Sequence, residues 1–263
     1  MTNAGVPLLQ LQGIRKHFGA VEALRGVDFT LRAGLVTALV GDNGAGKSTL
    51  IKCIAGIHTI DSGSVVWEGQ LVTIAGPADG AALGIEVVYQ DLALCDNLDV
   101  VQNMFLGREL RTGVRRLDEE TMEARTRETL ESLSVTTISS VRQQVASLSG
   151  GQRQSVAVAR AVMWNSRLVI LDEPTAALGV AQTKQVLTLV RKLADQGISV
   201  VLISHNLSDV FAVADRIAVL RLGRMVADVE PDDVTSNEVV QLITAGHAGF
   251  GDELETPLRR GHA

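Results

Sequence analysis

The stretch that decides the fold is Gly41-Asp42-Asn43-Gly44-Ala45-Gly46-Lys47-Ser48. It follows an apolar run, Val36 to Val40, and it leads into helix-forming residues from Lys47 to Ala55. The order is therefore strand, glycine-rich turn and helix, and the turn fits the pattern G-x-x-x-x-G-K-[ST]. Glycines allow backbone turns that other residues resist, and the N–H groups of such a turn converge on anions at a helix N-terminus. The stretch predicts a site for nucleotide phosphates.

Each residue of this phosphate turn has an expected contact. Lys47 should reach the β- and γ-phosphates, and Ser48 should offer its hydroxyl to Mg²⁺. A chance glycine turn is the alternative, and the strand before it and the helix after it count against that alternative. The expected cofactor contacts are Gly41, Asp42, Asn43, Gly44, Ala45, Gly46, Lys47, Ser48 and Thr49.

Outward from the turn, the chain alternates apolar runs with helical patterns. Residues 8–32 indicate short strands. Further along the chain, Leu130 and Leu133 have the spacing of one face of an amphipathic helix. Further strands are expected at 64–68, 85–89, 168–171 and 200–203, and a closing hairpin from 217–220 and 225–229 about Gly223. Helices are expected at 118–134, 151–163 and 180–194. The pattern predicts an α/β core with a helical segment inserted between Gln90 and Leu168.

Two carboxylates end one of the buried apolar runs. Asp172 and Glu173 follow Leu168 to Leu171, and ligands of parallel sheets bind at the carboxyl ends of strands. Asp172 is expected to hold Mg²⁺, directly or through water, and Glu173 to polarise the attacking water. The alternative is a helix N-cap pair before Pro174.

Two further features point to the same chemistry. His205 follows the next apolar strand, so it should lie at the same sheet edge and contact the γ-phosphate; a satisfied surface histidine is the alternative. The run from Leu148 to Gln152 is a second glycine turn that opens a helix. It presents N–H groups and a hydroxyl to an anion, although an ordinary helix cap would look similar.

Composition restricts the class of protein. The chain of 263 residues carries a formal net charge of -6 with both signs interleaved, which argues against non-specific nucleic-acid binding. Cys53 and Cys95 are expected to be reduced, buried thiols. No secretory signal is recognisable, and no apolar stretch approaches the roughly 20 residues that span a bilayer. We therefore expect a cytosolic protein, and any membrane attachment must come through a partner.

Five features occur in a fixed order: the phosphate turn, Gln90, the turn at Leu148, the Asp172-Glu173 pair and His205. Together they resemble the ATP-binding-cassette family, and the turn resembles its signature sequence letter for letter. The resemblance covers residues 8–245. It implies an α/β fold of the P-loop NTPase (RecA-like) type with an N-terminal antiparallel β subdomain and an inserted helical subdomain. A single cassette domain at 8–245, with the helical part at about 92–165, and a loose tail at 246–263 are expected.

The resemblance also implies further roles. Gln90 matches the glutamine that contacts Mg²⁺ and senses the membrane partner. Phe18 stands where the family stacks an aromatic ring on adenine, although it could equally be a core residue. Family members form head-to-tail dimers, in which Lys47 of one subunit binds ATP that the signature turn of the other covers. That turn would contribute Ser149, Gly150, Gly151 and Gln152.

One departure from the family pattern and three local stretches of sequence indicate which branch of the family the chain resembles. Gly179 stands where many family members carry an aspartate that links the two sites of the dimer, which puts that contact in doubt. The stretches 41–45, 103–109 and 176–180 are similar to ATPases of monosaccharide importers of the ribose, xylose and fructose type. The branch implies permease subunits and a separate sugar-binding protein as partners, with this chain on the cytoplasmic side of the membrane. Import of another small solute, and a non-transport ATPase or regulatory module, are the alternatives.

Overall fold

The strand before the phosphate turn, β3 (Val36–Val40), lies inside a six-stranded sheet. The computed structural model describes residues 6–113 and 116–247. In this core sheet the order is β12-β11-β3-β10-β9-β6, and every pair is parallel except β11 with β12. The other strands are β6 (Ile85–Val88), β9 (Leu168–Asp172), β10 (Ser199–Ile203), β11 (Arg216–Arg221) and β12 (Arg224–Val229).

The core strands are apolar along their length because both faces of the sheet are covered. In β9, Val169 and Leu171 pack in one cluster with the helical segment. Leu168 and Ile170, which point to the opposite face, pack in a second cluster with the N-terminal strands. This alternation fixes the register of β9, since a shift by one residue would exchange the two faces.

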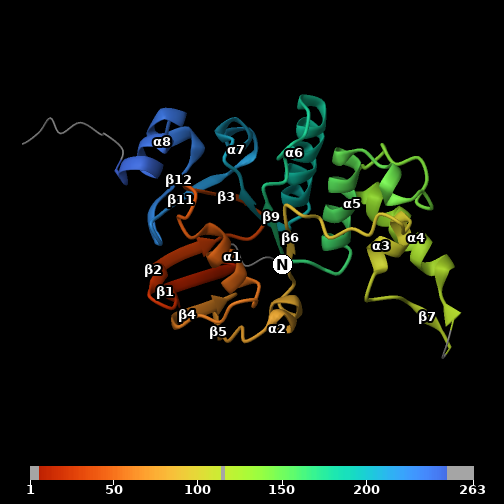
Figure 1. The fold of residues 1–263 in the computed structure, drawn as a ribbon, viewed down its shortest axis with the longest axis horizontal. Helices are drawn as coiled ribbons and strands as arrows, with labels where there is room; N and C mark the ends of the chain where they lie inside the picture. The colour runs from red at the N-terminus through yellow and green to blue at the C-terminus, as the bar shows by residue number, and fades with distance from the viewer. Residues whose placement is uncertain (1–5, 114–115, 248–263) are drawn as a thin grey trace, which may run out of the picture.

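The expected short strands at 8–32 are one long hairpin in a second sheet, of order β2-β1-β4-β5. Its strands are β1 (Leu9–Phe18), β2 (Val21–Leu31), β4 (Ser62–Trp67) and β5 (Gln70–Val72). All its pairs are antiparallel. Helix α1 (Lys47–Ile54) buries Leu50 and Ile51 in the cluster that this sheet shares with the core sheet. The β1–β5 sheet and α1 form one side of the molecule (Figure 1).

The inserted helical segment lies on the other side (Figure 1). Between β6 and β9 the chain forms α3 (Val100–Phe105), β7 (Arg111–Thr112), β8 (Arg116–Leu117), α4 (Glu119–Ser132), a 3₁₀ turn (Val145–Ser147) and α5 (Gly150–Val162). Leu130 and Leu133 are both buried, as their spacing predicts. The helical segment therefore replaces a simple crossover between two neighbouring parallel strands.

Helix α6 (Val180–Asp195) and the β11–β12 hairpin agree with the sequence-based predictions to within about a residue. Three short helices and one longer helix have no counterpart in those predictions. They are α2 (Pro77–Ala82), α3, α7 (Leu207–Val213) and α8 (Ser236–Ala245). No helix in the described part of the chain is long and apolar enough to cross a membrane. The predicted loose tail is 246–263, and from residue 248 on it lies outside the described residues.

Candidate nucleotide-binding site

The phosphate turn joins β3 to α1, and close packing shapes it. A Cβ atom added to Gly41 would lie 2.2 Å from the carbonyl oxygen of Leu220 in β11. A Cβ atom on Gly46, the N-cap of α1, would lie 2.9 Å from the carbonyl oxygen of Ala23. Both positions therefore need glycine because neighbouring backbone leaves no room for a side chain.

Lys47 lies over the phosphate turn. Its Nζ donates hydrogen bonds to the carbonyl oxygens of Gly41, at 2.7 Å, and Asp42, at 3.0 Å. Burial lowers the pKa of Lys47, and the carboxylates of Glu173, Asp42 and Asp172 act against that lowering. The ammonium group is thus held where it could exchange carbonyl partners for phosphate oxygens. Ser48 is exposed and Thr49 half-buried in the first turn of α1.

The sheet order brings the predicted residues to one edge. The strands β3, β10, β9 and β6 are parallel neighbours, so their carboxyl ends lie side by side. The phosphate turn follows β3, His205 follows β10, Asp172 and Glu173 end β9, and Gln90 follows β6. Residues that are more than 160 positions apart in the chain share this edge because a parallel sheet gathers its ligand-binding loops at one end.

Glu173 and His205 are in direct contact. The Oε2 atom of Glu173 lies 2.8 Å from Nδ1 of His205, and this oxygen is buried without a hydrogen bond of good geometry. The side chain of Glu173 is 18% exposed and that of His205 is 77% exposed. Glu173 also has a φ of 51°, a left-handed conformation that is strained for a residue with a side chain. A strained, buried acceptor is the arrangement expected of a group that works on a substrate rather than one that stabilises the fold.

Asp172 is the partly buried last residue of β9. Burial raises its pKa, the neighbouring Glu173 raises it further, and Lys47 and Lys52 oppose both effects. The N-cap alternative for the Asp172-Glu173 pair is wrong, because the next helix, α6, begins only after its cap at Gly179. Within the described residues no group of three or more His, Cys, Asp or Glu side chains gathers as a metal cage. Mg²⁺ does not require one, since it keeps several waters and accepts oxygen ligands of the kind that Asp172, Ser48 and Gln90 offer.

Gln90 is exposed just past the end of β6. This strand end adjoins the carboxylate pair because Val88 of β6 pairs with Leu171 of β9, and the pKa of the neighbouring Tyr89 is raised by burial and by the charge of Asp172. Two side chains of the helical segment hold the chain beyond Gln90. Arg160 of α5 donates to the carbonyl oxygens of residues 92 and 93, and Asn103 of α3 binds the backbone of residues 95, 98 and 99. The chain that follows Gln90 therefore connects the sheet edge to the helical segment.

The sequence-based analysis missed Arg160 and Asn103. Asn103 is fully buried in α3, whose only other polar residue is the exposed Gln102, and an asparagine among the apolar residues of this run was the available signal. Arg160 had no signal, because the carbonyl groups that it binds are 67 and 68 residues away in the chain.

The second glycine turn opens α5. Ser149 is the exposed N-cap of this helix. The Gln152 N–H donates to Ser149 Oγ at 3.4 Å, and the Ser149 N–H donates to Gln152 Oε1 at 2.8 Å. Gly150 and Gly151 pack closely against Leu178 and Gln182. Helices α5 and α1 lie in different lobes (Figure 1), so this turn and the phosphate turn belong to separate parts of one chain.

Phe18, at the end of β1, is 44% exposed, so the core alternative for this residue is wrong. Its ring packs edge-on against His58, with centroids 5.1 Å apart, and Lys16 Nζ lies 5.6 Å from the ring centroid. One part of the aromatic surface therefore stays available to a planar ligand. Gly179, at the start of α6, is exposed and has an ordinary φ of -73°.

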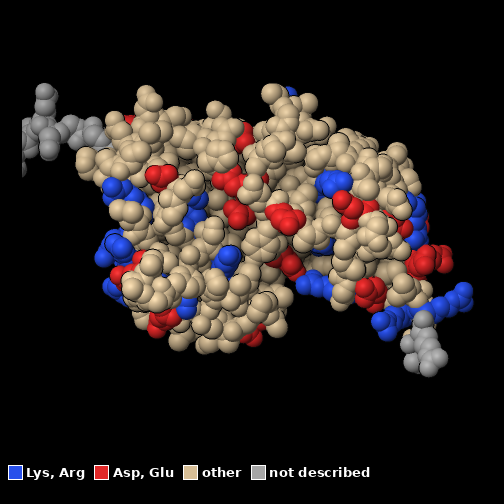
Figure 2. All heavy atoms as spheres, viewed as in Figure 1, with Lys and Arg blue, Asp and Glu red and all other residues tan. Residues whose placement is uncertain are grey.

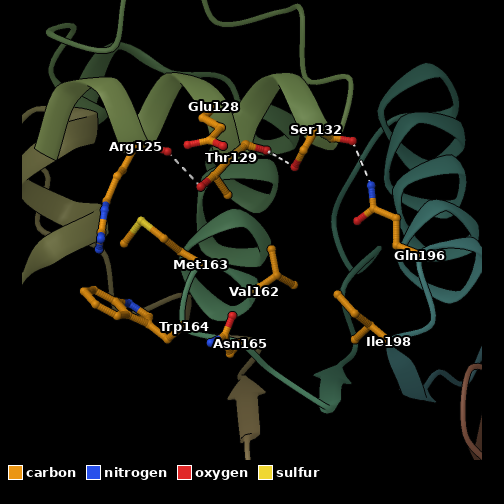
Figure 3. Close-up of a pocket in the computed structure, with 10 residues that line it drawn as sticks. All are labelled: Arg125, Glu128, Thr129, Ser132, Val162, Met163, Trp164, Asn165, Gln196 and Ile198. Carbon is orange, nitrogen blue, oxygen red and sulfur yellow. Dashed lines mark hydrogen bonds between the residues drawn. The ribbon is translucent and has the colours of Figure 1, made fainter. Parts of the chain in front are cut away.

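Acidic side chains and two cavities are further features of the molecule. Figure 2 shows acidic side chains along the boundary between the lobe that carries α1 and the lobe that carries α3, α4 and α5. A cavity of about 230 Å³ in the helical lobe is lined by Glu86, Arg108 and Trp164 among others. Trp164 also lines a neighbouring cavity of about 490 Å³, whose wall includes Arg125 and Met163 (Figure 3). None of the predicted nucleotide-site residues lines either cavity.

Comparison with known proteins gives consistent results. The family model described as "ABC transporter" matches residues 24–176. The chain is 46% identical over 244 residues to the fructose import ATP-binding protein FrcA of Rhizobium meliloti, covering 90% of this chain and 94% of that protein. It is 43% identical to the xylose/arabinose import ATP-binding protein XylG of Sulfolobus acidocaldarius, covering 94% and 98%. It spans 50% of the ribose import ATP-binding protein RbsA of Yersinia pestis, with 38% identity over 96% of this chain.

Solved structures agree with these relatives. A nucleotide-free ATP-binding cassette of an ABC transporter superposes with a TM-score of 0.75 at 29% identity, covering 85% of this chain and 91% of that one. The ADP conformation of another such cassette gives 0.77 at 28% identity, covering 90% and 94%. With the phosphate turn, the carboxylate pair and the second glycine turn in place, this nucleotide-binding chain belongs to the ABC transporter family.

Proposed function

We propose that this chain binds and hydrolyses ATP to energise an importer of monosaccharides. The observation that carries the proposal is the sheet edge at which the phosphate turn, the Asp172-Glu173 pair, His205 and Gln90 meet. The names of the relatives, which include fructose, xylose/arabinose and ribose import ATP-binding proteins, support a monosaccharide as the solute. In this proposal residues 8–245 act as one cassette domain.

Nucleotide binding rests on the phosphate turn. Its N–H groups and Lys47 surround the phosphates, and the exposed ring of Phe18 stacks on the adenine. The residues that would hold Mg²⁺ are Ser48, Asp172 and Gln90, and the ion would neutralise charge that develops on the phosphate oxygens. A cation held there would offset the burial and the Glu173 charge that raise the pKa of Asp172.

Hydrolysis is assigned to the contact of Glu173 with His205. The Glu173 carboxylate accepts a proton from the attacking water. Its Oε2 lies 2.8 Å from His205 Nδ1 without a hydrogen bond of good geometry, so it can accept a hydrogen bond from that water. His205, which is largely exposed, reaches beyond Glu173 to the γ-phosphate and holds the carboxylate in place. Glu173 thus acts as the base, and His205 acts as the positioning donor.

The site is completed by a second copy of the chain. Ser149 and Gly150 are exposed at the start of α5, where N–H groups and the helix dipole favour an anion. They lie in a different lobe from the phosphate turn, so in a head-to-tail homodimer the turn of Ser149, Gly150, Gly151 and Gln152 covers the nucleotide of the partner.

The membrane partner binds near the helical segment. The segment from Gln90 to Glu109 borders the cavity lined by Glu86 and Arg108 and is tied to α5 through Arg160. Closure of the dimer can therefore move a permease that is bound there. In this proposal two permease subunits hold the chain at the cytoplasmic face of the membrane, and a separate sugar-binding protein delivers the solute.

Glu173→Gln tests the assigned chemistry. The amide cannot take a proton from water, so we expect ATP turnover to fall by about 10²- to 10⁴-fold while ATP binding persists. Glu131→Gln, an exposed position on α4, is the matched control and should hydrolyse ATP at the wild-type rate. Wild-type turnover in Glu173→Gln would remove Glu173 from the mechanism.

Co-purification tests the use of that chemistry. The full chain, expressed together with the permease genes that neighbour its own, should purify with a multi-span membrane protein and support ATP-dependent uptake of a monosaccharide. A chain that hydrolyses ATP at full rate with no membrane partner would favour a non-transport ATPase. Uptake of a solute other than a sugar would retain the importer and reject its assigned substrate.

A further inference from the structure

The segment after Glu173 is tied to α7 by a partly buried hydrogen bond. The Thr175 hydroxyl donates to Asp209 Oδ2 at 2.7 Å. Asp209 lies in the first turn of α7, four residues beyond His205, and is only 6% exposed. A carboxylate is seldom buried without a purpose, because its charge must be compensated by hydrogen bonds or ion pairs.

This bond is one of three links between the same two stretches of chain. The Glu173 N–H donates to the Ile203 carbonyl oxygen at 3.0 Å, and the Glu173 carboxylate contacts the His205 ring at 2.8 Å. The Thr175–Asp209 bond is the third link, and it lies two residues beyond Glu173 in the chain. Of the three, it alone joins two side chains away from the expected position of the nucleotide, so ATP has no need to break it.

The backbone that these links hold is strained. Glu173 and Ala177, on either side of Thr175, have φ values of 51° and 61°. Each left-handed residue with a side chain costs on the order of 1 kcal/mol, and such conformations persist only where surrounding contacts impose them. The Thr175–Asp209 bond is such a contact, since it fixes the residue between the two strained positions.

The same segment reaches the second glycine turn of its own chain. Leu178 lies so close to Gly150 that a Cβ atom there would be 3.0 Å from Leu178 Cδ2. Gln182, in the first turn of α6, packs likewise against Gly151. A shift of residues 175–178 would therefore disturb both Glu173 and the turn at Ser149.

We propose that Asp209, acting through Thr175, is a positioning residue that holds Glu173 and the second glycine turn in register. The inference rests on the proposed ATPase function. It adds that the buried Asp209 carboxylate on α7 aligns Glu173, the base of the chain's own site, with the turn at Ser149 that the chain presents to its partner. Neither Asp209 nor Thr175 contacts the nucleotide.

Thr175→Val in the full chain tests the inference. Valine keeps the shape of threonine and removes the hydroxyl, so Asp209 loses its donor. With ATP and Mg²⁺ we expect kcat to fall by about 10- to 100-fold, because a base displaced by about 1 Å loses rate on that scale. The KM for ATP should change less than about 2-fold, since the phosphate turn is untouched. Amide hydrogens of residues 173–178 should exchange faster.

Rescue and control variants separate positioning from general stability. Thr175→Ser retains the hydroxyl and Asp209→Asn retains an acceptor, so both should stay within about 3-fold of the wild-type kcat. Thr175→Val and Asp209→Leu together should be no slower than either alone, because both remove one bond. Thr129→Val, which removes a hydroxyl bonded to the Arg125 carbonyl oxygen within α4, should have the wild-type kcat.

A wild-type kcat in Thr175→Val would overturn the inference and leave the proposed function intact. Equal losses in Thr175→Val and Thr175→Ser would also overturn it, since the hydroxyl would then be irrelevant. If Asp209→Leu does not fold, the comparison of valine with serine at position 175 still decides. A wild-type chain without ATPase activity would instead refute the proposed function.

Discussion

At the scale of single residues, the phosphate turn shows how neighbouring backbone restricts the choice of side chain. Gly41 lies against the Leu220 carbonyl oxygen, whereas Gly44 has no atom within 4 Å of an added Cβ, although its φ of 79° is left-handed. Gly41→Ala should therefore lower the free energy of unfolding by about 3 kcal/mol or more, from clash and strain together. Gly44→Ala, the control, should lose about 1 kcal/mol from strain alone. Urea unfolding of both variants measures this, and equal losses would contradict the packing described.

The two cysteines should differ in reactivity. Burial raises the pKa of Cys53 to about 11, whereas Cys95 is partly exposed beyond Gln90. Only the thiolate reacts, so at pH 8 an alkylating reagent should modify Cys95 first. Cys53 should react only on unfolding or as the pH approaches about 11, because the folded state retains its proton up to that range. Mass spectrometry of timed samples measures the order, and equal rates at pH 8 would contradict the burial of Cys53.

The sequence predicted where most of the candidate residues lie. The phosphate turn, the Asp172-Glu173 pair and His205 could be placed because each follows an apolar run that a parallel sheet must bury. The supporting side chains could not. Asp209 meets Thr175 34 residues away, and nothing local distinguishes it from an ordinary acidic residue in the first turn of a helix.

At the scale of elements, Ser149 combines two tasks at the start of α5. It caps the helix, and in the proposed dimer it faces the γ-phosphate of the partner's ATP. Ser149→Asp keeps a good cap, so the free energy of unfolding should stay within about 1 kcal/mol of wild type, yet its charge should repel phosphate and abolish turnover. Ser149→Ala, which adds no charge, should lose about 1 kcal/mol of stability and retain more activity. Calorimetry and ATPase assays measure the pair, and full activity in Ser149→Asp would contradict the phosphate contact.

Helix α3 depends on its buried asparagine. Asn103 accepts from the Cys95 N–H at 2.7 Å and donates to three carbonyl groups of the preceding loop. Asn103→Leu should cost about 2–4 kcal/mol, because several backbone groups lose their partner. Hydrogen exchange should rise at residues 95–99, next to Gln90. Unchanged exchange there would show that the loop holds itself without the side chain.

Long elements were predictable from sequence and short ones were not. Helix α6 buries a regular apolar face, Val186, Leu189, Val190 and Leu193, whose spacing is that of a helix. Helices α3 and α7 have only six and seven residues, too few to show a period, and their apolar runs could equally be strands. The capping box of Thr235 with Glu238 was a usable signal for α8.

At the scale of the whole molecule, the phosphate turn before α1 and the glycine turn that opens α5 lie in different lobes of one chain (Figure 1). The phosphate turn and Glu173 belong to the core sheet, and Ser149 belongs to the helical lobe. The strained segment from Glu173 to Leu178 connects them within the chain. We propose that two copies, placed head to tail, complete two sites.

The mass of Glu173→Gln in solution tests this claim most directly. With ATP and Mg²⁺ the variant should have twice the mass of the 28.0 kDa chain, and with ADP it should have the mass of one chain. The same variant carrying Ser149→Asp should remain a single chain with ATP. A Glu173→Gln chain that binds ATP yet keeps the mass of one chain at every protein concentration, while the wild type hydrolyses ATP, would contradict the shared site.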